Sequence, residues 1–326
     1  MADYTDIIGT IFIAFIIAVA LGPIVLPLLR KLNIGQSIRE DGPQTHLKKT
    51  GTPTMGGIII MIAMLITLFL SGIINADLID KNIYILILAT LGFGMIGLID
   101  DYIIVVKKRN LGLKAYQKLI GQILLAILLA LYHSSSSELG TKLIVPFLDN
   151  QYIDLGALYI PFIVFVVVGT VNSVNLTDGL DGLASGVTLI VLSFFAIVAF
   201  SWGMTSISIF ALALAGSCLG FLMHNAYPAK VFMGDTGSLA LGGAVSAIAV
   251  LLNLPLIIPI VGGIYFIEAL SVIIQVVFFK LKGKRVFLMS PLHHHYEQKG
   301  WKETKIVLIF WTITLILCMI GIYSLT

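Results

Sequence analysis

The sequence is poor in charged residues and almost without cysteine. Of its 326 residues, 11% are charged and 58% are hydrophobic, whereas an ordinary soluble domain is about 25% charged. A chain with this composition and a mean hydropathy of +1.03 cannot be solvated as a water-soluble globule. The sequence therefore indicates an integral membrane protein. Cys218 and Cys318 both lie in apolar runs, so a disulfide framework is not expected.

Several motifs of well-known enzyme and transporter classes are also absent. No G-x-x-x-x-G-K phosphate loop and no G-x-S-x-G nucleophile elbow occur. The two halves of the chain show no convincing mutual similarity, which counts against a transporter built from repeats. The net charge is only +3, and we expect no nucleic-acid partner. The first apolar run is long enough to span a membrane, so we expect a retained helix there.

Ten segments are apolar and long enough, or nearly so, to cross a membrane, which takes roughly 20 residues of helix. We therefore predict an all-α polytopic protein with ten transmembrane helices in one domain, residues 1–326. The predicted spans lie at 7–29, 54–74, 82–99, 119–132, 158–176, 183–202, 206–224, 237–253, 256–280 and 304–325.

The basic residues predict how the chain is oriented. Eighteen of the 20 lysines and arginines fall in the connections on one side, and only Lys81 and Lys142 fall on the other. Positive loops stay in the cytoplasm, so we predict that both termini face outward. On the outer side, two short apolar runs flank Asp149–Gln151 and predict a small surface β-hairpin. The polar stretches all lie on the cytoplasmic side, where we expect an active-site cleft.

The first polar stretch is GLIDDY, with Asp100 and Asp101 at the predicted end of the third helix. Acidic residues at a helix C-terminus oppose the helix dipole. Two interpretations stay open, a pair of solvated boundary carboxylates or a paired acid site for metal binding or proton transfer.

The second stretch is VNSVNLTDGLDGLASG. Asn172, Asn175, Asp178 and Asp181 recur at intervals of three, which in a helix places them along one side. The alternative is a helix C-cap followed by an aspartate N-cap. That alternative leaves the two asparagines unexplained.

The third stretch, HNAYPAKVFMGDTGS, places Asp235 between two glycines just before the eighth predicted helix. Asp235 is either an N-cap or a ligand of Mg²⁺, which takes one or two protein carboxylates together with phosphate and water. We also assign Asn225 and Phe232 of this stretch to the substrate site.

Three consecutive histidines, His293, His294 and His295, form the fourth stretch. Consecutive histidines do not converge easily on one tetrahedral zinc, so phosphate or nucleotide contact, or proton transfer, is favoured over a solvated loop. The fifth stretch is HLKKTGTPTMGG, in which Lys49 either sets topology or contacts substrate. Its Thr52–Pro53 pair predicts a helix start.

The ninth predicted helix is too long for a bilayer and carries one polar face. Pro259 and the Gly262–Gly263 pair predict a break or bend. Glu268, Ser271 and Gln275 follow on one side, and a charged residue at this depth is expected to face protein or water. We expect this face to turn toward the cytoplasmic site and to open a lateral path for a lipid.

Together the carboxylates, amides, lysines and histidines suit a phosphorylated ligand and a hard metal ion at the membrane surface. GLIDDY, NSVNLTDGLDGLASG, VFMGDTGSLALGG and PLHHHYEQKGW resemble the phospho-N-acetylmuramoyl-pentapeptide transferases (translocase I) over essentially the whole chain. This family is a bacterial branch of the polyprenyl-phosphate N-acetylhexosamine-1-phosphate transferases. Sister enzymes that use UDP-N-acetylglucosamine, and more distantly an anion or nucleotide-sugar transporter, remain as alternatives.

The resemblance implies a Mg²⁺-dependent transfer of phospho-N-acetylmuramoyl-pentapeptide from its UDP-linked donor to undecaprenyl phosphate, giving lipid I and UMP. It implies a site facing the cytoplasm in the bacterial inner membrane, and we also consider a homodimer. The implied catalytic residues are Asp100, Asp101, Asp178 and His293, and the metal ligand is Asp235. The residues assigned to substrate binding are Lys49, Lys118, Asn172, Asn175, Asp181, Asn225, Phe232, Gln275, His294 and His295. Direct attack by the lipid phosphate, oriented by Asp100, is preferred to prior phosphorylation of Asp101.

Overall fold

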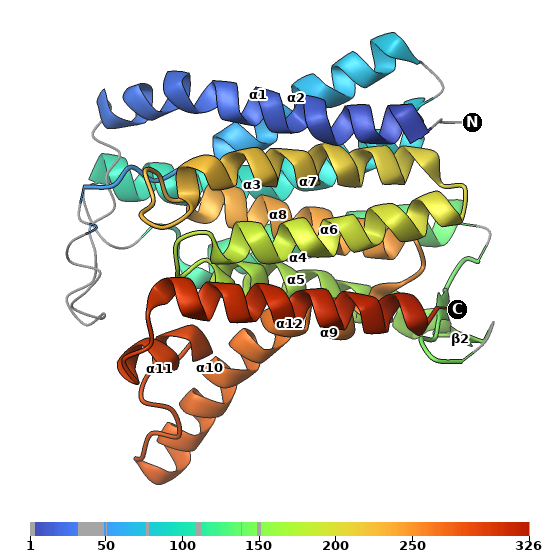
Figure 1. The fold of residues 1–326 in the computed structure, drawn as a ribbon. Helices are drawn as coiled ribbons and strands as arrows, with labels where there is room; N and C mark the ends of the chain where they lie inside the picture. Colours follow the sequence, from blue (N-terminus) through green and yellow to red (C-terminus); the bar gives the residue numbers. More distant parts are fainter. Residues whose placement is uncertain are drawn as a thin grey trace.

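The computed structural model is a bundle of long helices (Figure 1) and describes residues 4–31, 49, 51–75, 78–107, 112–137, 139–148 and 151–325. Ten of its helices are long and apolar enough to cross a membrane, which confirms the predicted all-α class. The helices are α1 (Tyr4–Lys31), α2 (Gly57–Ile74), α3 (Lys81–Lys107), α4 (Ala115–Ser136), α5 (Tyr159–Thr177), α6 (Leu183–Ser201), α7 (Thr205–Asn225), α8 (Gly234–Leu251), α9 (Ile258–Val261), α10 (Gly263–Lys282), α11 (Leu292–Gln298) and α12 (Glu303–Tyr323).

Helices α7 and α8 form the centre of the bundle and are the most deeply buried of the ten spans. Helices α1, α2 and α6 pack on α7, and α3 and α5 pack on α8. Helix α3 approaches α8 closely at Gly97, where a Cβ would lie 2.0 Å from the Asp235 carbonyl oxygen. A side chain at position 97 would therefore separate the ends of α3 and α8, which carry the acidic residues.

Both termini and the small sheet lie at one end of the bundle, as Figure 1 shows. Strands β1 (Lys142–Ile144) and β2 (Tyr152–Asp154) pair antiparallel, with Leu143 opposite Ile153, which confirms the predicted hairpin. It is tied to the bundle through the N–H of Ile144, which donates to the Asn253 carbonyl at 3.0 Å. The orientation of the termini and of the hairpin relative to the membrane stays a prediction.

Several helix boundaries differ from the prediction, and those of the second, third and eighth helices bear on the site. The third helix continues past Asp100 and Asp101 to Lys107, because the apolar run Tyr102–Val106 extends it. The second helix begins at Gly57, and Pro53 instead accepts a hydrogen bond at its carbonyl from Phe232 N–H at 2.8 Å. The eighth helix begins at Gly234, so Asp235 lies in its first turn and makes no side-chain cap. The N-cap interpretation of Asp235 is therefore wrong.

The predicted break in the ninth segment is confirmed. A short 3-10 turn (Pro255–Ile257) leads into the four-residue α9, which ends at Val261. After Gly262, α10 starts at Gly263 in a new direction. In Figure 1, α10 slants away from the other helices and ends outside the bundle. The histidine stretch forms α11, a helix that the sequence did not predict, and it packs between α10 and α12.

A partly buried contact between α1 and α7 follows from a proline inside α1. Pro23 has no backbone N–H, so the carbonyl of Val19, four residues earlier, loses its helical donor. His224 of α7 fills this place, with its Nε2 3.2 Å from the Val19 carbonyl oxygen. The imidazole thus carries its hydrogen on Nε2. It joins α7 to α1 at the Val19 carbonyl, for which α1 has no backbone donor of its own.

We predict that His224→Leu lowers the free energy of unfolding by about 1–3 kcal/mol, since the Val19 carbonyl is left without a donor. Thermal unfolding of the detergent-solubilised protein measures this change. In a Pro23→Ala background the helix regains its own N–H donor, so the same substitution should then cost less. Equal costs in the two backgrounds would contradict the assignment.

Candidate active site

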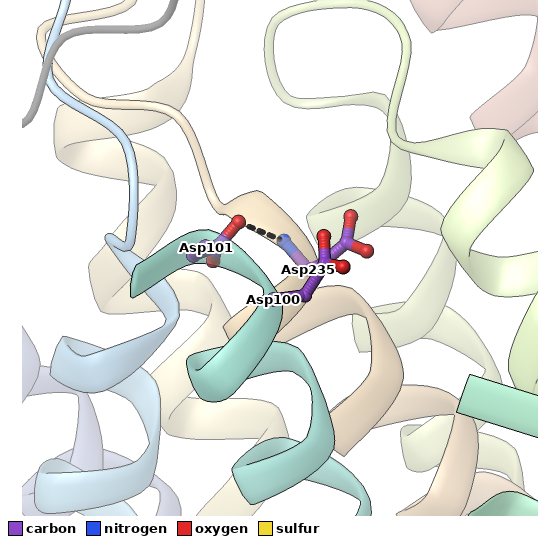
Figure 2. Close-up of side chains that lie close together, drawn as sticks. All are labelled: Asp100, Asp101 and Asp235. Carbon is purple, nitrogen blue, oxygen red and sulfur yellow. Dashed lines mark hydrogen bonds between the residues drawn. The ribbon is translucent and has the colours of Figure 1, made fainter. Parts of the chain in front are cut away.

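Three carboxylates from two helices meet at the end of the bundle away from the hairpin (Figure 2). Asp100 and Asp101 lie on α3, and Asp235 lies in the first turn of α8. Each offers an oxygen within 4.8 Å of the others. Although adjacent residues on a helix point about 100° apart, both aspartates of α3 reach the start of α8, by different sides.

Asp101 is bound to the N-terminus of α8. Its Oδ2 accepts hydrogen bonds from the Thr236 N–H at 2.9 Å and the Thr236 hydroxyl at 2.6 Å, and its Oδ1 accepts from the Asp235 N–H at 3.3 Å. The first N–H groups of a helix have no partner in their own helix and carry partial positive charge. Asp101 therefore satisfies these groups and is itself 5% exposed.

Asp100 faces a lysine instead. Lys118 of α4 places its ammonium 2.9 Å from Asp100 Oδ2 and 2.5 Å from Asp235 Oδ2. The Leu113 N–H donates to Asp100 Oδ1 at 2.6 Å. Asp235 and Lys118 remain about a quarter exposed, so this side of the cluster is open to a ligand while the Asp101 side is closed by protein.

The polar stripe of α5 is divided by the structure. Asn175 donates to Asp235 Oδ1 at 2.9 Å and to the Ser238 hydroxyl at 2.8 Å, which joins it to the acid cluster. Asn172 lies one turn earlier and donates to Gln122 Oε1 at 2.7 Å. The prediction of a continuous helical stripe is wrong beyond Thr177, where α5 ends and Asp178 is the C-cap.

Asp178 approaches the acid cluster from the turn between α5 and α6. The Gly234 N–H donates to it. Burial raises the pKa of Asp178 to about 8, and the neighbouring carboxylates of Asp235, Asp101 and Asp181 add to the rise. The cluster thus holds more negative charge than Lys118 neutralises.

A second charged cluster lies on the other side of the same turn. The Lys49 ammonium is 2.7 Å from Asp181 Oδ1 and 2.7 Å from Glu303 Oε1. The Asp181 N–H also donates to Glu303 at 2.7 Å, and the Ala229 N–H donates to Asp181 Oδ2 at 2.9 Å. Burial opposes the charge on Lys49, but hydrogen bonds to Asp181 and Glu303 outweigh it and raise the pKa of the lysine.

Two predicted binding residues hold the backbone around these clusters. The Asn225 amide accepts from the Gly182 N–H and the Ser185 hydroxyl and donates to the Val231 carbonyl, with 3% of the residue exposed. Phe232 uses its backbone, and its carbonyl accepts from the Gly56 N–H at 2.8 Å. These contacts join the segment before α2 to the segment before α8.

The three histidines have three different surroundings. His293 is fully buried against Glu268 of α10. His294 Nδ1 lies 2.7 Å from Glu297 Oε2, and the Leu288 N–H donates to His295 Nδ1 at 3.1 Å. Gln275 accepts from the backbone N–H groups of residues 286 and 287. His295 and Gln275 therefore fix the chain between α10 and α11.

Sequence reasoning missed residues that share these clusters. Thr236 and Ser238 lie in the GDTGS stretch beside Asp235, and their hydroxyl groups were the available signal. Glu303 is the one acidic residue in the basic run KGWKETK before the last helix. That reversal of sign was the signal for Glu303.

Comparison with known proteins places the chain in a family. The glycosyl transferase family 4 model matches residues 83–253, from the start of α3 to the end of α8. The chain is 61% identical to the phospho-N-acetylmuramoyl-pentapeptide-transferase of Alkaliphilus oremlandii over 99% of both chains. It is 60% identical to that of Alkaliphilus metalliredigens over 100% of both, and 54% identical to that of Clostridioides difficile over 99% of both. The chain belongs to the phospho-N-acetylmuramoyl-pentapeptide-transferase family.

The matched region of this family member contains the whole acid cluster. Asp100, Lys118, Asn175 and Asp235 all fall within residues 83–253. The second cluster lies partly outside that region and α11 lies wholly outside it, and the full-length relatives cover both. The family is thus supported over the parts of the chain that form both clusters.

We predict that Lys118→Met lowers the free energy of unfolding in the presence of a chelator. The loss should be about 1–3 kcal/mol, below the value for a fully buried pair because the ammonium and Asp235 are partly solvated. Thermal unfolding in detergent measures it. Lys114→Met on the exposed side of the same helix start is the matched control, and equal stability of the two variants would contradict the prediction.

Proposed function

We propose that this family member transfers phospho-N-acetylmuramoyl-pentapeptide from its UDP-linked donor to undecaprenyl phosphate, with release of UMP. The observation that carries the proposal is the acid cluster of α3 and α8, open on the side of Asp235 and Lys118. An ammonium and carboxylates at the end of a membrane bundle suit a reaction in which a water-soluble diphosphate meets a lipid phosphate.

The residues of this site fit Mg²⁺. Asp100, Asp101 and Asp235 offer hard oxygen donors within 4.8 Å of one another, and Mg²⁺ prefers carboxylates together with phosphate and water. The Lys118 ammonium already stands between Asp100 and Asp235, which supports a cation at this place. When bound, the ion neutralises phosphate charge, and Asp235 is the ligand we assign first.

The contacts of the two α3 aspartates favour direct attack by the lipid phosphate. Both oxygens of Asp101 are occupied by the N-terminus of α8, so phosphorylation of Asp101 requires those bonds to break. Asp100 contacts the ammonium of Lys118, which is about a quarter exposed. Asp100 therefore orients the attacking phosphate together with Lys118, and the reaction gains mainly from positioning.

The second cluster and the turn between α5 and α6 complete the donor site. Lys49 and Asp181 offer a cation and an anion on the side of the turn away from Asp100, and we assign them to the nucleotide part of the donor. Asp178 lies between the two clusters. We further propose that the site faces the cytoplasm of a bacterial inner membrane. A homodimer stays a prediction.

An assay with purified protein tests the proposed function. Radiolabelled UDP-N-acetylmuramoyl-pentapeptide and undecaprenyl phosphate should give a lipid-soluble labelled product and an equal amount of UMP when Mg²⁺ is present. Added chelator should abolish both products. Lack of product, or equal use of UDP-N-acetylglucosamine as donor, would refute the proposal.

In the same assay, Asp235→Asn should reduce turnover by about 10²-fold or more, the scale of one lost electrostatic contact in the transition state. Mg²⁺ should also raise the thermal unfolding midpoint of the unmodified protein and not that of the variant. Asp154→Asn, at the opposite end of the bundle in β2, is the control. A variant with unchanged Mg²⁺ dependence would mean that Asp235 does not hold the ion.

Cysteine labelling tests the proposed orientation. Cys218 and Cys318 are buried, so the unmodified protein should not react with membrane-impermeant maleimide. Lys284→Cys, exposed after α10, should react only when the reagent reaches the cytoplasm, and Asp154→Cys only from outside. The reverse pattern would place the site away from its nucleotide substrate.

A further inference from the structure

Glu268 is a charged residue that the proposed reaction does not use. It lies on α10 in the second turn after the break, and none of its surface is exposed. A buried carboxylate in a membrane helix is costly unless a partner compensates it. Among the residues that the structure describes, the one basic group found at ion-pair distance is the imidazole of His293.

Glu268 holds His293 at two points. Its Oε1 accepts a hydrogen bond from the His293 backbone N–H at 3.2 Å, and its Oε2 lies 3.2 Å from His293 Nδ1. The first contact anchors the start of α11 on α10, and the second is an ion-pair distance at which neither atom makes a hydrogen bond among the described residues. Glu268 therefore places a carboxylate oxygen beside Nδ1 of the buried ring.

The other side of the ring presses on the turn that carries Asp178. His293 Nε2 lies so close to Gly179 that a Cβ built at position 179 would be 2.1 Å from it. Nε2 is buried and has no hydrogen-bond partner among the described residues. Because glycine has no side chain, the ring can lie directly against the backbone one residue after Asp178.

We propose that Glu268 is a positioning residue that acts through His293. It fixes the imidazole, the imidazole supports Gly179, and Asp178 is thereby kept at the acid cluster. This inference rests on the proposed function. Glu268 belongs to α10, the helix that slants away from the bundle. The position of α10 therefore affects Asp178 through the side chains of Glu268 and His293.

A double-mutant cycle tests the proposal. Glu268→Gln keeps an oxygen for the His293 N–H but removes the charge beside Nδ1. We expect turnover to fall by about 10- to 100-fold, by analogy with the loss of a carboxylate that orients a metal-binding histidine, with KM for both substrates unchanged. In a His293→Ala background the same substitution should have no further effect, because residues that act as a unit are not additive.

Ser271→Ala is the matched control. Ser271 lies on the same face of α10 and donates only to the Glu268 backbone carbonyl, at 2.7 Å, so turnover should stay near that of the unmodified protein. If the losses of turnover in Glu268→Gln and His293→Ala multiply in the double variant, the inference is wrong. It is also wrong if Glu268→Gln raises KM and leaves turnover unchanged.

A second cycle does not need activity. Gly179→Ala should lower the thermal unfolding midpoint by displacing the ring, and it should do so far less in His293→Ala. Equal shifts would overturn the contact even if Glu268→Gln fails to fold. Absence of lipid-linked product from the unmodified protein would refute the proposed function, whereas an active protein with independent Glu268, His293 and Gly179 effects would refute this inference alone.

Discussion

The bond between the Asp101 carboxylate and the first turn of α8 is the contact on which the site depends. A carboxylate near the C-terminal end of a helix is opposed by the dipole of that helix, and Asp101 overcomes this by accepting hydrogen bonds from the N-terminus of another. The glycine at position 97 lets α3 come close enough for the bond to form. Once the two helix ends are joined, Asp235 necessarily lies beside Asp100, and the charge of three carboxylates is concentrated at one point.

That concentration of charge explains the other contacts around it. Lys118 bridges Asp100 and Asp235, and Asn175 also donates to Asp235. The Thr236 hydroxyl donates to Asp101, and the Ser238 hydroxyl accepts from Asn175. These groups do not remove all of the negative charge, because three carboxylates share the single ammonium of Lys118. The cluster is therefore held in a state that a further cation stabilises. A protein that binds phosphate through a metal ion gains from such an arrangement, since the site is set before the ligand arrives.

The sequence predicts this molecule well where the signal is local. Composition, turn residues and proline predict the ten apolar helices, the hairpin around Asp149–Gln151 and the break at Gly262. The structure agrees in each case. Asp149 and Asn150 themselves lie outside the described residues. The predictions that failed concern residues with distant partners. Asp100 and Asp101 look like a helix end because charge usually ends an apolar helix, but bonds to α8 and α4 allow the helix to continue. Glu303 could not be assigned, because its partner Lys49 is 254 residues away.

The turn between α5 and α6 explains why carboxylates follow an apolar helix in this chain. Asp178 contributes to the acid cluster, and Asp181, three residues later, binds Lys49 and Glu303. Each carboxylate has its own donors, so neither faces lipid, and the cost of charge near a membrane is offset on both sides. The two clusters cannot shift independently, since four residues of chain join them and the ring of His293 lies against Gly179 in between. In the proposed function, a donor that spans a nucleotide and a diphosphate would meet two charged sites whose separation is set by a single short turn. His293 lies against that turn and is hydrogen-bonded to Glu268 of α10.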